Sequence, residues 1–387
     1  MTKIVVILMI ILLTSSMGCN KDSKDSLDIK ITELEIEDKI YPMNLEKEEE
    51  YRFNVVSKGF PIIAKIKAKD ELFVYFLTNK DKNCEILRMT TNFEIRNRYI
   101  IRYGSGPGEA RNPRIYGGDS KAVIVYDPPI NKFIRYDSDF KFINEFRVKD
   151  LGIFFYSGYK YVPTYQFVLD GFSEYINRYE IIFSIYIRKF INNKKINDTK
   201  IFETPIIKRI IKENKKMVVG RSIHFGYFYN HIYILEKREY RIIKMDIEGN
   251  VLIHKKIRFK PKSFSESLRK KWVEKFYRNP KRIRDFDYPA KLWPACWIIA
   301  VGEGIAVGRC EDYDPENKGP IMADYYDKNL NYLGKIGIPY FFAWNHPSSG
   351  QSSANYFLFY KDGKLYSTVE RDDENWIIRW GVEIEKN

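Results

Sequence analysis

The sequence predicts an all-β fold: a six-bladed β-propeller of four-stranded blades, with one helical insertion at about residues 263–279. Two observations lead to this prediction. A strand–turn–strand pattern recurs along the chain, and 387 residues are too many for one ordinary hydrophobic core. Apolar residues make up 44% of the chain, and its 29 Tyr and 26 Phe favour strands over disorder. In a ring, stacked blades bury each other's faces.

The formal net charge of the chain is +14. A charge of this sign can indicate binding to nucleic acid or to an anionic surface. The basic residues are spread along the whole chain, however, which is typical of solvated faces. The N-terminal segment also predicts export from the cytoplasm. We therefore expect no nucleic-acid partner.

The first 18 residues have the pattern of a signal peptide. Lys3 precedes an apolar run, residues 4–13, that is too short to span a bilayer. The Ser-Met-Gly-Cys motif that ends at Cys19 resembles a bacterial lipobox, in which the cysteine is lipidated and becomes the new N-terminus. We expect Cys19 to anchor the protein in the bacterial cell envelope, with the outer membrane as the expected membrane. The alternative is a plain secretory peptide with an incidental cysteine.

The internal repeat is clearest in two stretches. Asp127 ends one predicted strand and Asp137 ends the next, ten positions later, and Glu236 and Asp246 repeat this spacing. Six such units can be recognised, of which the third matches least well. The units are residues 71–101, 122–146, 179–202, 231–257, 305–338 and 364–385. The alternative is chance similarity among the strands of a two-domain β protein.

Each unit is predicted to reverse direction in a tight turn between its last two strands, which become the third and fourth strands when a preceding strand completes the blade. The turns at residues 137–140 and 327–330 match closely, and the turn at residues 90–93 matches loosely. The turn that begins at Asp246 is interpreted as carrying one extra residue. Asp or Asn at these positions can accept hydrogen bonds from its own backbone and can adopt left-handed geometry.

The predicted domain organisation follows from these two features. Residues 1–18 are the signal peptide, residues 19–50 are a tether and N-terminal segment, and residues 51–387 are the propeller. The residues just after Cys19 are polar and charged, as a tether requires. To close the ring, either residues 28–37 or residues 51–56 could add a strand beside the last blade.

A glycine-rich turn, residues 104–109, connects the first two units. Glycine supplies positive φ without steric cost, and Pro107 fixes one φ near about −65°. The segment lacks the Gly-Lys-Ser/Thr ending of a phosphate-binding loop, and Pro113 breaks the helix that a dinucleotide-binding turn requires. We interpret this turn as a joint between blades, with Glu109 as its hydrogen-bonding anchor.

The glycine turn, the strand after it, the acidic end of that strand at Asp127 and the turn at Asp137 together resemble a known family. They are similar to uncharacterised six-bladed β-propeller lipoproteins of bacteria, with NHL- or TolB-like blades. The resemblance is clearest over residues 100–146. Ala110 stands where that family usually has an aromatic residue. The resemblance implies the fold and the envelope location, and it implies no reaction.

The predicted helical insertion is amphipathic. Its apolar residues recur every four positions: Phe264, Leu268, Trp272 and Phe276. Its other face is basic and carries Arg269, Lys270, Lys271, Lys275 and Arg278. This helix could be a basic lid that docks an acidic partner, a glycan or an anionic lipid surface. It could equally be an insertion that packs its apolar stripe on the propeller and leaves its lysines in water.

The cysteines after Cys19 are three in number, so they cannot form a complete disulfide framework. A hairpin with the three-residue loop 302–304 would place Cys296 opposite Cys310, within disulfide range. Whether the two are bonded stays open. The four histidines show no metal-ligand spacing, and no zinc or nucleophile-elbow motif occurs. We expect no cofactor and assign no metal ligand.

Two functions remain. The first is a non-catalytic envelope module that binds protein or glycan. The second is a metal-dependent hydrolase or lactonase of the propeller type, with a divalent cation on the axis. The candidate binding or axial residues are Glu109, Arg111, Asp127, Glu236, Asp312 and Glu370. Because Asp127 and Glu236 are equivalent in the repeat, we favour a role for them in turns and blade packing, and we assign no catalytic residue.

Overall fold

The fold is described from a computed structural model of the chain. The structure describes residues 32–34, 43–53, 62–65, 71–77, 83–118, 122–130, 132–137, 139–147, 159–162, 167–177, 180–191, 194–208, 216–217, 223–259, 263, 265–267, 270, 286–287, 294–309, 321–338, 358–361, 363–371 and 374–384. The predicted signal peptide and Cys19 lie outside these residues.

The described strands form six sheets, called blades 1 to 6 here, each with four antiparallel strands, and one of the sheets also includes a parallel strand. Blade 1 contains β3 (Ile62–Lys65), β4 (Glu71–Leu77), β5 (Cys84–Thr90) and β6 (Ile95–Ile101). Blade 2 contains β7 (Arg114–Gly118), β8 (Ala122–Asp127), β9 (Lys132–Asp137) and β10 (Phe142–Arg147). Blade 3 contains β11 (Tyr159–Val162), β12 (Phe167–Asn177), β13 (Glu180–Ile191) and β14 (Lys194–Lys208).

The remaining blades follow in chain order. Blade 4 contains β16 (Ile223–Phe228), β17 (His231–Glu236), β18 (Arg241–Met245) and β19 (Val251–Ile257). Blade 5 contains β21 (Ala295–Val301), β22 (Gly304–Arg309), β23 (Ile321–Tyr326) and β24 (Tyr332–Ile338). Blade 6 contains β25 (Leu358–Lys361), β26 (Lys364–Arg371), β27 (Glu374–Ile384) and β2 (Met43–Phe53). A 3-10 turn, Pro128–Ile130, joins β8 to β9.

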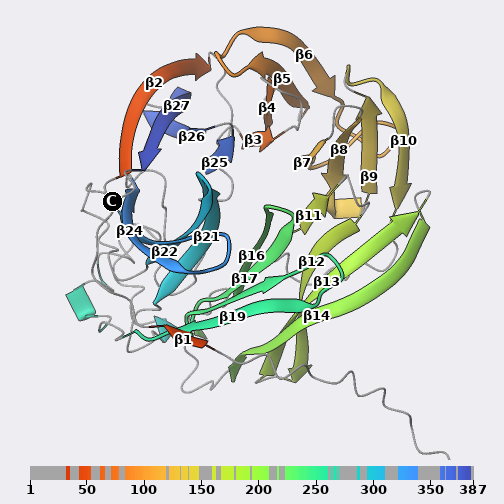
Figure 1. Ribbon diagram of the computed structural model, residues 1–387. Helices are drawn as coiled ribbons and strands as arrows, with labels where there is room; N and C mark the ends of the chain where they lie inside the picture. The colour runs from red at the N-terminus through yellow and green to blue at the C-terminus, as the bar shows by residue number, and fades with distance from the viewer. Residues whose placement is uncertain are drawn as a thin grey trace, which may run out of the picture.

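Figure 1 shows the six blades arranged in a ring around a central axis. The first strand of each blade is the inner one, and these strands contact one another from blade to blade. The contacts join β3 to β7, β7 to β11, β16 to β21, β21 to β25 and β25 to β3. The predicted all-β propeller of four-stranded blades is therefore confirmed.

The hydrophobic core is divided among the seams between neighbouring blades. One cluster joins Ile86 of blade 1 to Val125 of blade 2, and another joins Ile185 of blade 3 to Ile234 of blade 4. Two further clusters join blade 4 to blade 5 and blade 6 to blade 1. Each blade has two apolar faces that it cannot bury alone, so stacking in a ring is what stabilises it.

The ring is closed by a strand from the N-terminal segment. β2 pairs antiparallel with β27, with Met43 opposite Ile384 and Phe53 opposite Asn375. Of the two stretches proposed for closure, residues 51–56 contribute their described part, residues 51–53, to this strand beside the last blade. The closing strand begins within residues 19–50, the segment that the sequence separated from the propeller.

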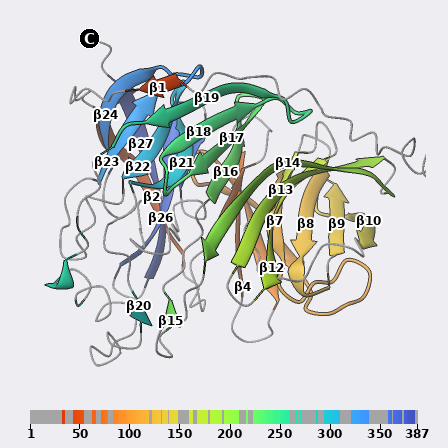
Figure 2. The same ribbon diagram turned by 90° about the horizontal axis from the view of Figure 1, so that it is seen from below.

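The other proposed stretch contributes to a different blade. β1 (Thr32–Leu34) pairs in parallel with β19, with Thr32 opposite Lys255 and Leu34 opposite Ile257. The N-terminal segment therefore lies first on the outer strand of blade 4 and then on blade 6 (Figure 1). A separate two-stranded sheet pairs β15 (Lys216–Met217) with β20 (Phe286–Asp287), and Figure 2 shows it apart from the blades.

The turn after the third strand has one hydrogen-bonding pattern in blades 1, 2, 4 and 5. In blade 5 the N–H of Leu330 donates to the carbonyl of Asp327 at 3.0 Å. Oδ1 of Asp327 accepts from the N–H groups of Asn329 at 2.7 Å and Asn331 at 2.8 Å. Asp137 and Asp246 accept the same two bonds, and Thr90 accepts one with its hydroxyl.

The turn at Asp246 does not carry an extra residue, which corrects the prediction. The N–H of Gly249 donates to the carbonyl of Asp246, the same spacing as in the other turns. The match was hidden because glycine replaces the hydrophobic residue of the fourth position. At that position φ is 61° for Phe93, 57° for Phe140 and 59° for Leu330.

Left-handed geometry costs a non-glycine residue about 1–2 kcal/mol. The cost is offset in these turns because the side chain is used in a seam. Leu330 is fully buried between blades 4 and 5, and Phe93 packs edge-on against Tyr366 of blade 6. Phe140 of blade 2 stacks on Tyr99 of blade 1, with ring centroids 4.5 Å apart. The turns of blades 1, 2 and 5 therefore each insert a side chain against the preceding blade.

A β-bulge follows each of these turns in the fourth strand. The bulged residues are Arg96 in blade 1, Ile143 in blade 2, Leu252 in blade 4 and Leu333 in blade 5. β2 has a bulge at the equivalent position, Glu48, although no turn connects β2 to β27. Bulges bend an outer strand away from further pairing, and this limits association through sheet edges.

The predicted helical insertion falls mostly outside the described residues. Glu266, Ser267 and Lys270 have helical backbone and are exposed. Arg269, Lys271, Lys275 and Arg278 lie outside the described part of the chain. Within that part, the structure contains no helix with the length and apolarity needed to cross a membrane.

Candidate functional site

The glycine turn lies between blades 1 and 2 and is held by Glu109. Oε2 of Glu109 accepts a hydrogen bond from the N–H of Gly106 at 2.9 Å. A Cβ on Gly104 would collide with this carboxylate, so the close approach requires glycine there. Glu109 thus has the anchoring position that the sequence suggested for it.

Blade 2 binds the same turn from the other side. The buried Lys132 donates through Nζ to the carbonyl of Gly106 at 2.8 Å and lies 3.1 Å from Oε2 of Glu145. That oxygen also accepts from the N–H of Gly108 at 3.1 Å. The hydroxyl of Tyr136 donates to the carbonyl of Gly108 at 2.8 Å. Burial raises the pKa of Tyr136, so its hydroxyl stays a donor at neutral pH.

Asp127 fixes the chain just after the turn. Its Oδ2 accepts from the N–H of Arg111 at 2.9 Å and its Oδ1 from the N–H of Asn112 at 3.0 Å. Asp127 is fully buried, and the side chain of Arg111 donates to Ser105 Oγ at 3.0 Å. The structure therefore brings three predicted site residues, Glu109, Arg111 and Asp127, around one turn.

The other predicted site residues are not brought to this turn. Glu236 ends β17 in blade 4 and forms an ion pair with Arg241 across the hairpin. Glu370 pairs through its backbone with Asn375 in blade 6, and its side chain is outside the description. Asp312 lies outside the described residues. Among the residues described, no group of three or more His, Cys, Asp or Glu could hold a metal ion.

A buried polar network between blades 4 and 5 was missed by the sequence reasoning. Arg309 donates through Nε to both oxygens of Asp324, at 3.0 and 2.9 Å, and its Nη2 lies 2.8 Å from Oδ1. The hydroxyl of Tyr240 donates to Oδ2 of the same carboxylate and lies 3.1 Å from the hydroxyl of Tyr326. The two tyrosines and Asp324 are fully buried.

The protonation states in this network are set by burial and by the charges of its own residues. Burial raises the pKa of Asp324 above its ordinary value, and the hydrogen bonds and charge of Arg309 oppose that shift. Burial, followed by the nearby Asp324, raises the pKa of Tyr240 and of Tyr326 well above 10.0. Both phenols therefore stay protonated at neutral pH. The signal in the sequence was Arg309 itself, which occupies the repeat position of Asp127 and Glu236.

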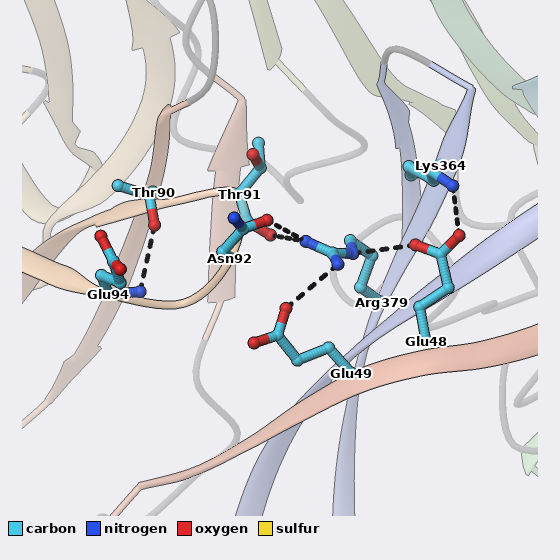
Figure 3. Close-up of polar contacts among 8 residues, drawn as sticks. All are labelled: Glu48, Glu49, Thr90, Thr91, Asn92, Glu94, Lys364 and Arg379. Atoms are coloured by element: carbon cyan, nitrogen blue, oxygen red, sulfur yellow. Dashed lines mark hydrogen bonds and ion pairs between the residues drawn. The ribbon is translucent and has the colours of Figure 1, made fainter.

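A second missed cluster closes the ring, and Figure 3 shows it around Arg379 of β27. Arg379 donates through Nε to Glu48 at 3.0 Å, and its Nη2 lies 3.1 Å from Glu49. Its Nη1 donates to the carbonyl of Thr91 at 2.5 Å and to Oδ1 of Asn92 at 2.6 Å. One guanidinium therefore joins the N-terminal strand, blade 6 and the turn of blade 1.

The contact between Arg379 and the next blade has counterparts elsewhere in the ring. Arg88 of blade 1 donates to Asp139 in the turn of blade 2 at 3.2 Å. Lys244 of blade 4 donates to the carbonyl of Lys328 in the turn of blade 5 at 2.9 Å. Arg88 and Lys244 each lie two residues before the turn of their own blade. Arg379 occupies the matching position in β27. The repeat thus includes a basic residue that ties each of these blades to its neighbour.

The described cysteines are buried, and one of the described histidines accepts a backbone hydrogen bond. Cys296 is disulfide-bonded, while Cys84 is free, and burial followed by Glu85 raises the pKa of its thiol to about 12. Cys310 lies outside the described residues. The hairpin loop has two residues rather than the predicted three, since Val301 pairs with Gly304 and a bulge falls at Cys296. Nδ1 of His224 accepts from the N–H of Ile298 at 3.0 Å.

Searches against family models and curated proteins found no match to this chain. Among solved structures, a DUF4221 family member from Bacteroides vulgatus has a TM-score of 0.51 at 11% identity and covers 89% of this chain and 99% of its own. A putative exported protein from Bacteroides fragilis has a TM-score of 0.47 at 12% identity, covering 92% and 100%. The calcium-binding protein regucalcin from Agrobacterium tumefaciens has a TM-score of 0.39 at 10% identity, covering 90% of this chain and 97% of its own.

At these identities the likeness concerns the fold alone. The DUF4221 structure, with its TM-score of 0.51, is similar to this chain in overall fold. The chain is a β-propeller module.

Proposed function

We propose that this protein is a lipid-anchored β-propeller of the bacterial cell envelope, which binds protein or glycan and catalyses no reaction. One observation carries the non-catalytic part. Three of the five acidic residues considered for an axial cation are used by the fold: Asp127 accepts two backbone N–H groups, Glu109 holds its own turn and Glu236 pairs with Arg241. A carboxylate that already accepts such bonds serves the geometry of its loop.

The proposed binding face includes the loops that join one blade to the next. Tyr103, which is 45% exposed, follows the exposed Arg102 directly before the glycine turn, and Arg111 is exposed directly after it. Aromatic and arginine side chains contribute most to recognition in many interfaces. The network beneath the turn keeps its backbone in one conformation, and a rigid loop loses little entropy when it binds a ligand.

The first test concerns the anchor. An alkyne fatty acid supplied to cells should label the wild-type chain and leave Cys19→Ala unlabelled, and only the wild type should stay with the membranes after cell fractionation. Equal labelling of the two chains, or release of both into the soluble fraction, would show that Cys19 is not the anchor.

The second test separates a structural from a metal-binding role for Asp127. Asp127→Asn should lower the melting temperature by the same amount with millimolar calcium and with EDTA, because the lost bonds are to backbone N–H groups. Arg111→Ala, which keeps that backbone, is the control. A calcium-dependent rise in melting temperature that Asp127→Asn abolishes, together with lactone hydrolysis sensitive to EDTA, would instead support the hydrolase.

The third test concerns binding. A glycan array and cross-linking in intact cells should give ligands of the wild type that Tyr103→Ala binds at least about tenfold more weakly, as expected for the loss of an aromatic anchor. Ile143→Ala, which truncates an exposed side chain on the outer strand of blade 2, is the control. Equal ligand binding by the two variants would place the binding face elsewhere.

A further inference from the structure

We infer that the glycine turn between blades 1 and 2 binds an acidic glycan, whose uronate carboxylate pairs with Arg111 and whose sugar ring stacks on Phe142. The inference deepens the proposed function and rests on it, because it names the ligand class of the same binding face. Three observations support it: the arginines at the two ends of the turn, the exposed ring of Phe142, and the small size of the exposed aromatic surface.

The two ends of the turn are held together by its own backbone. The N–H of Ala110 donates to the carbonyl of Arg102 at 3.0 Å, and the N–H of Gly104 donates to the carbonyl of Ala110 at 3.3 Å. This closure brings Arg102, which precedes the turn, close to Arg111, which follows it, and both residues are exposed. The turn begins after β6, and β10 is the neighbouring outer strand on the rim (Figure 1).

The side chain of Arg111 is oriented, and its charge has no acidic partner in the part of the chain described. Its Nε donates to Ser105 Oγ at 3.0 Å, which uses one of the five N–H groups of the guanidinium and fixes its direction. No described carboxylate forms an ion pair with Arg111 or Arg102. The remaining N–H groups of Arg111 match the two oxygens of a carboxylate.

The carboxylates around the turn are already used within the protein. Asp127 accepts from the two backbone N–H groups that follow the turn, and Glu109 accepts from the N–H of Gly106. Glu145 accepts from the N–H of Gly108 and pairs with the buried Lys132. Among the described residues, none of the three forms an ion pair with the arginines, so an anionic ligand would not compete with an existing pair.

Phe142 is the exposed residue at its position in the repeat. The first residues of the other fourth strands with this turn, Ile95, Val251 and Tyr332, are partly buried and pack on the seam clusters. Phe142 is 44% exposed instead, and its ring lies against Gly108, where an added Cβ would be 3.3 Å from a ring carbon. The backbone of the turn therefore supports an aromatic ring that a ligand can reach.

The exposed aromatic surface is too small for a protein interface of standard size. Tyr103 and Phe142 are each less than half exposed and together present about 200 Å², whereas such an interface buries about 800 Å² per partner. The bulge at Ile143 also disfavours the addition of an extended peptide to the edge of β10. A uronate sugar fits better, because its C–H groups can face an aromatic ring while its carboxylate faces an arginine.

Carboxyl reduction supplies a matched probe, since it converts a uronate into the neutral sugar with the same ring. The full chain, purified in detergent, is titrated on an array of uronate polysaccharides and of their carboxyl-reduced forms. We expect native forms that bind at least about tenfold more tightly than the same polysaccharides after reduction. This preference should decrease in high salt. Equal binding to both forms of every polysaccharide would overturn the inference.

Two variants test the two contacts separately. Arg111→Gln should weaken binding of the native form about tenfold and leave binding of the reduced form unchanged. Phe142→Ala should weaken both forms several-fold, and Phe142→Trp should restore them. Leu252→Ala, which truncates an exposed side chain on blade 4, is the control and should change neither. Equal losses for both forms in Arg111→Gln, or unchanged binding by Phe142→Ala, would contradict the proposed contacts.

The same preparation distinguishes failure of this inference from failure of the proposed function. Binding of neutral glycans alone, or proteins cross-linked in intact cells without any glycan ligand, would refute the acidic glycan and leave the binding module intact. A chain with no ligand of either kind would refute both.

Discussion

Blades 5 and 6 are both four-stranded and antiparallel, but their fourth strands come from different parts of the chain. In blade 5 the turn from Asp327 to Leu330 joins β23 to β24 directly. In blade 6 the fourth strand is β2, more than three hundred positions away from β27 in the chain. Both fourth strands nevertheless have a bulge at the same position, Leu333 and Glu48. The bulge is therefore a property of strand pairing in this ring, and no particular turn is needed to produce it.

The two blades also differ in how they are tied to their neighbours. The seam between blades 4 and 5 contains the fully buried Tyr240 and Asp324, and the carboxylate of Asp324 accepts hydrogen bonds from both Tyr240 and Arg309. The seam from blade 6 to blade 1 is closed by Arg379 near the surface (Figure 3). An ion pair exposed to water contributes little to folding stability, whereas removing one partner of a buried ion pair strongly destabilises the protein. The two seams should therefore respond very differently to loss of one arginine.

The largest effect is expected from Arg309→Leu. It leaves Asp324 buried beside two protonated tyrosines without its charged partner, which costs about 3–5 kcal/mol. Urea denaturation followed by tryptophan fluorescence measures the free energy of unfolding. Arg96→Leu, which removes an exposed pair, is the control and should change it by less than about 1 kcal/mol. Equal losses for the two variants would mean that burial does not distinguish these pairs.

Leu330→Ala is expected to cost about 2–4 kcal/mol, because Leu330 is fully buried in the same seam and alanine leaves a cavity. Alanine keeps the strained left-handed geometry, so it brings no relief of strain. Leu330→Gly removes that strain and should recover about 1 kcal/mol relative to simple truncation. Thermal unfolding of both variants measures the difference. A glycine variant less stable than the alanine variant would show that the strain is not significant.

Arg379→Ala is expected to cost about 1–2 kcal/mol, since its contacts with Glu48, Glu49 and the turn of blade 1 are partly exposed. The loss should appear first as faster hydrogen exchange in β2, measured by mass spectrometry, while exchange in β24 stays unchanged. Opening of β24 together with β2 would mean that the ring unfolds as one unit and that the two seams are not independent.

The smallest effect is the pH dependence of the closing cluster. The hydrogen bond from Lys364 is the largest cause that lowers the pKa of Glu48 below 4.5, and Arg379 adds to it. A lowered folded-state pKa contributes stability above about pH 4.5, which is lost as the pH falls below that value. Glu48→Gln should remove this contribution, so the two chains should differ in stability at pH 7 and converge at lower pH. A constant difference at every pH would exclude the titration of Glu48 as its source.

The turns show what sequence reasoning could reach. Asp137 and Asp327 share an acidic start and a hydrophobic fourth residue, and these local features are enough to identify the turn. The turn at Asp246 has the same hydrogen bonds but ends in Gly249, so the spacing was misjudged. A repeated turn can be recognised in the sequence only where the residue types at its key positions are also repeated.

The candidate site was predictable to a smaller degree. Glu109 was correctly expected to be an anchor of its turn, because glycines and a carboxylate three residues apart can bond locally. The partners Lys132 and Glu145 come from other strands of blade 2, and no spacing indicates them. Arg309 and Arg379 could have been found only by comparing equivalent positions of all blades and asking which carry an unexpected charge.

The sequence by itself determined the strands, the turns and the modular plan, because these depend on residues within one blade. The tertiary structure decided which strand closes the ring. β2 closes the ring because ten of its residues pair in register with β27 and its bulged residue, Glu48, lies against Arg379 and Lys364. It also placed β1 on blade 4. Closure joins the two ends of the chain, and long-range pairing of this kind has no local signal that a sequence pattern can carry.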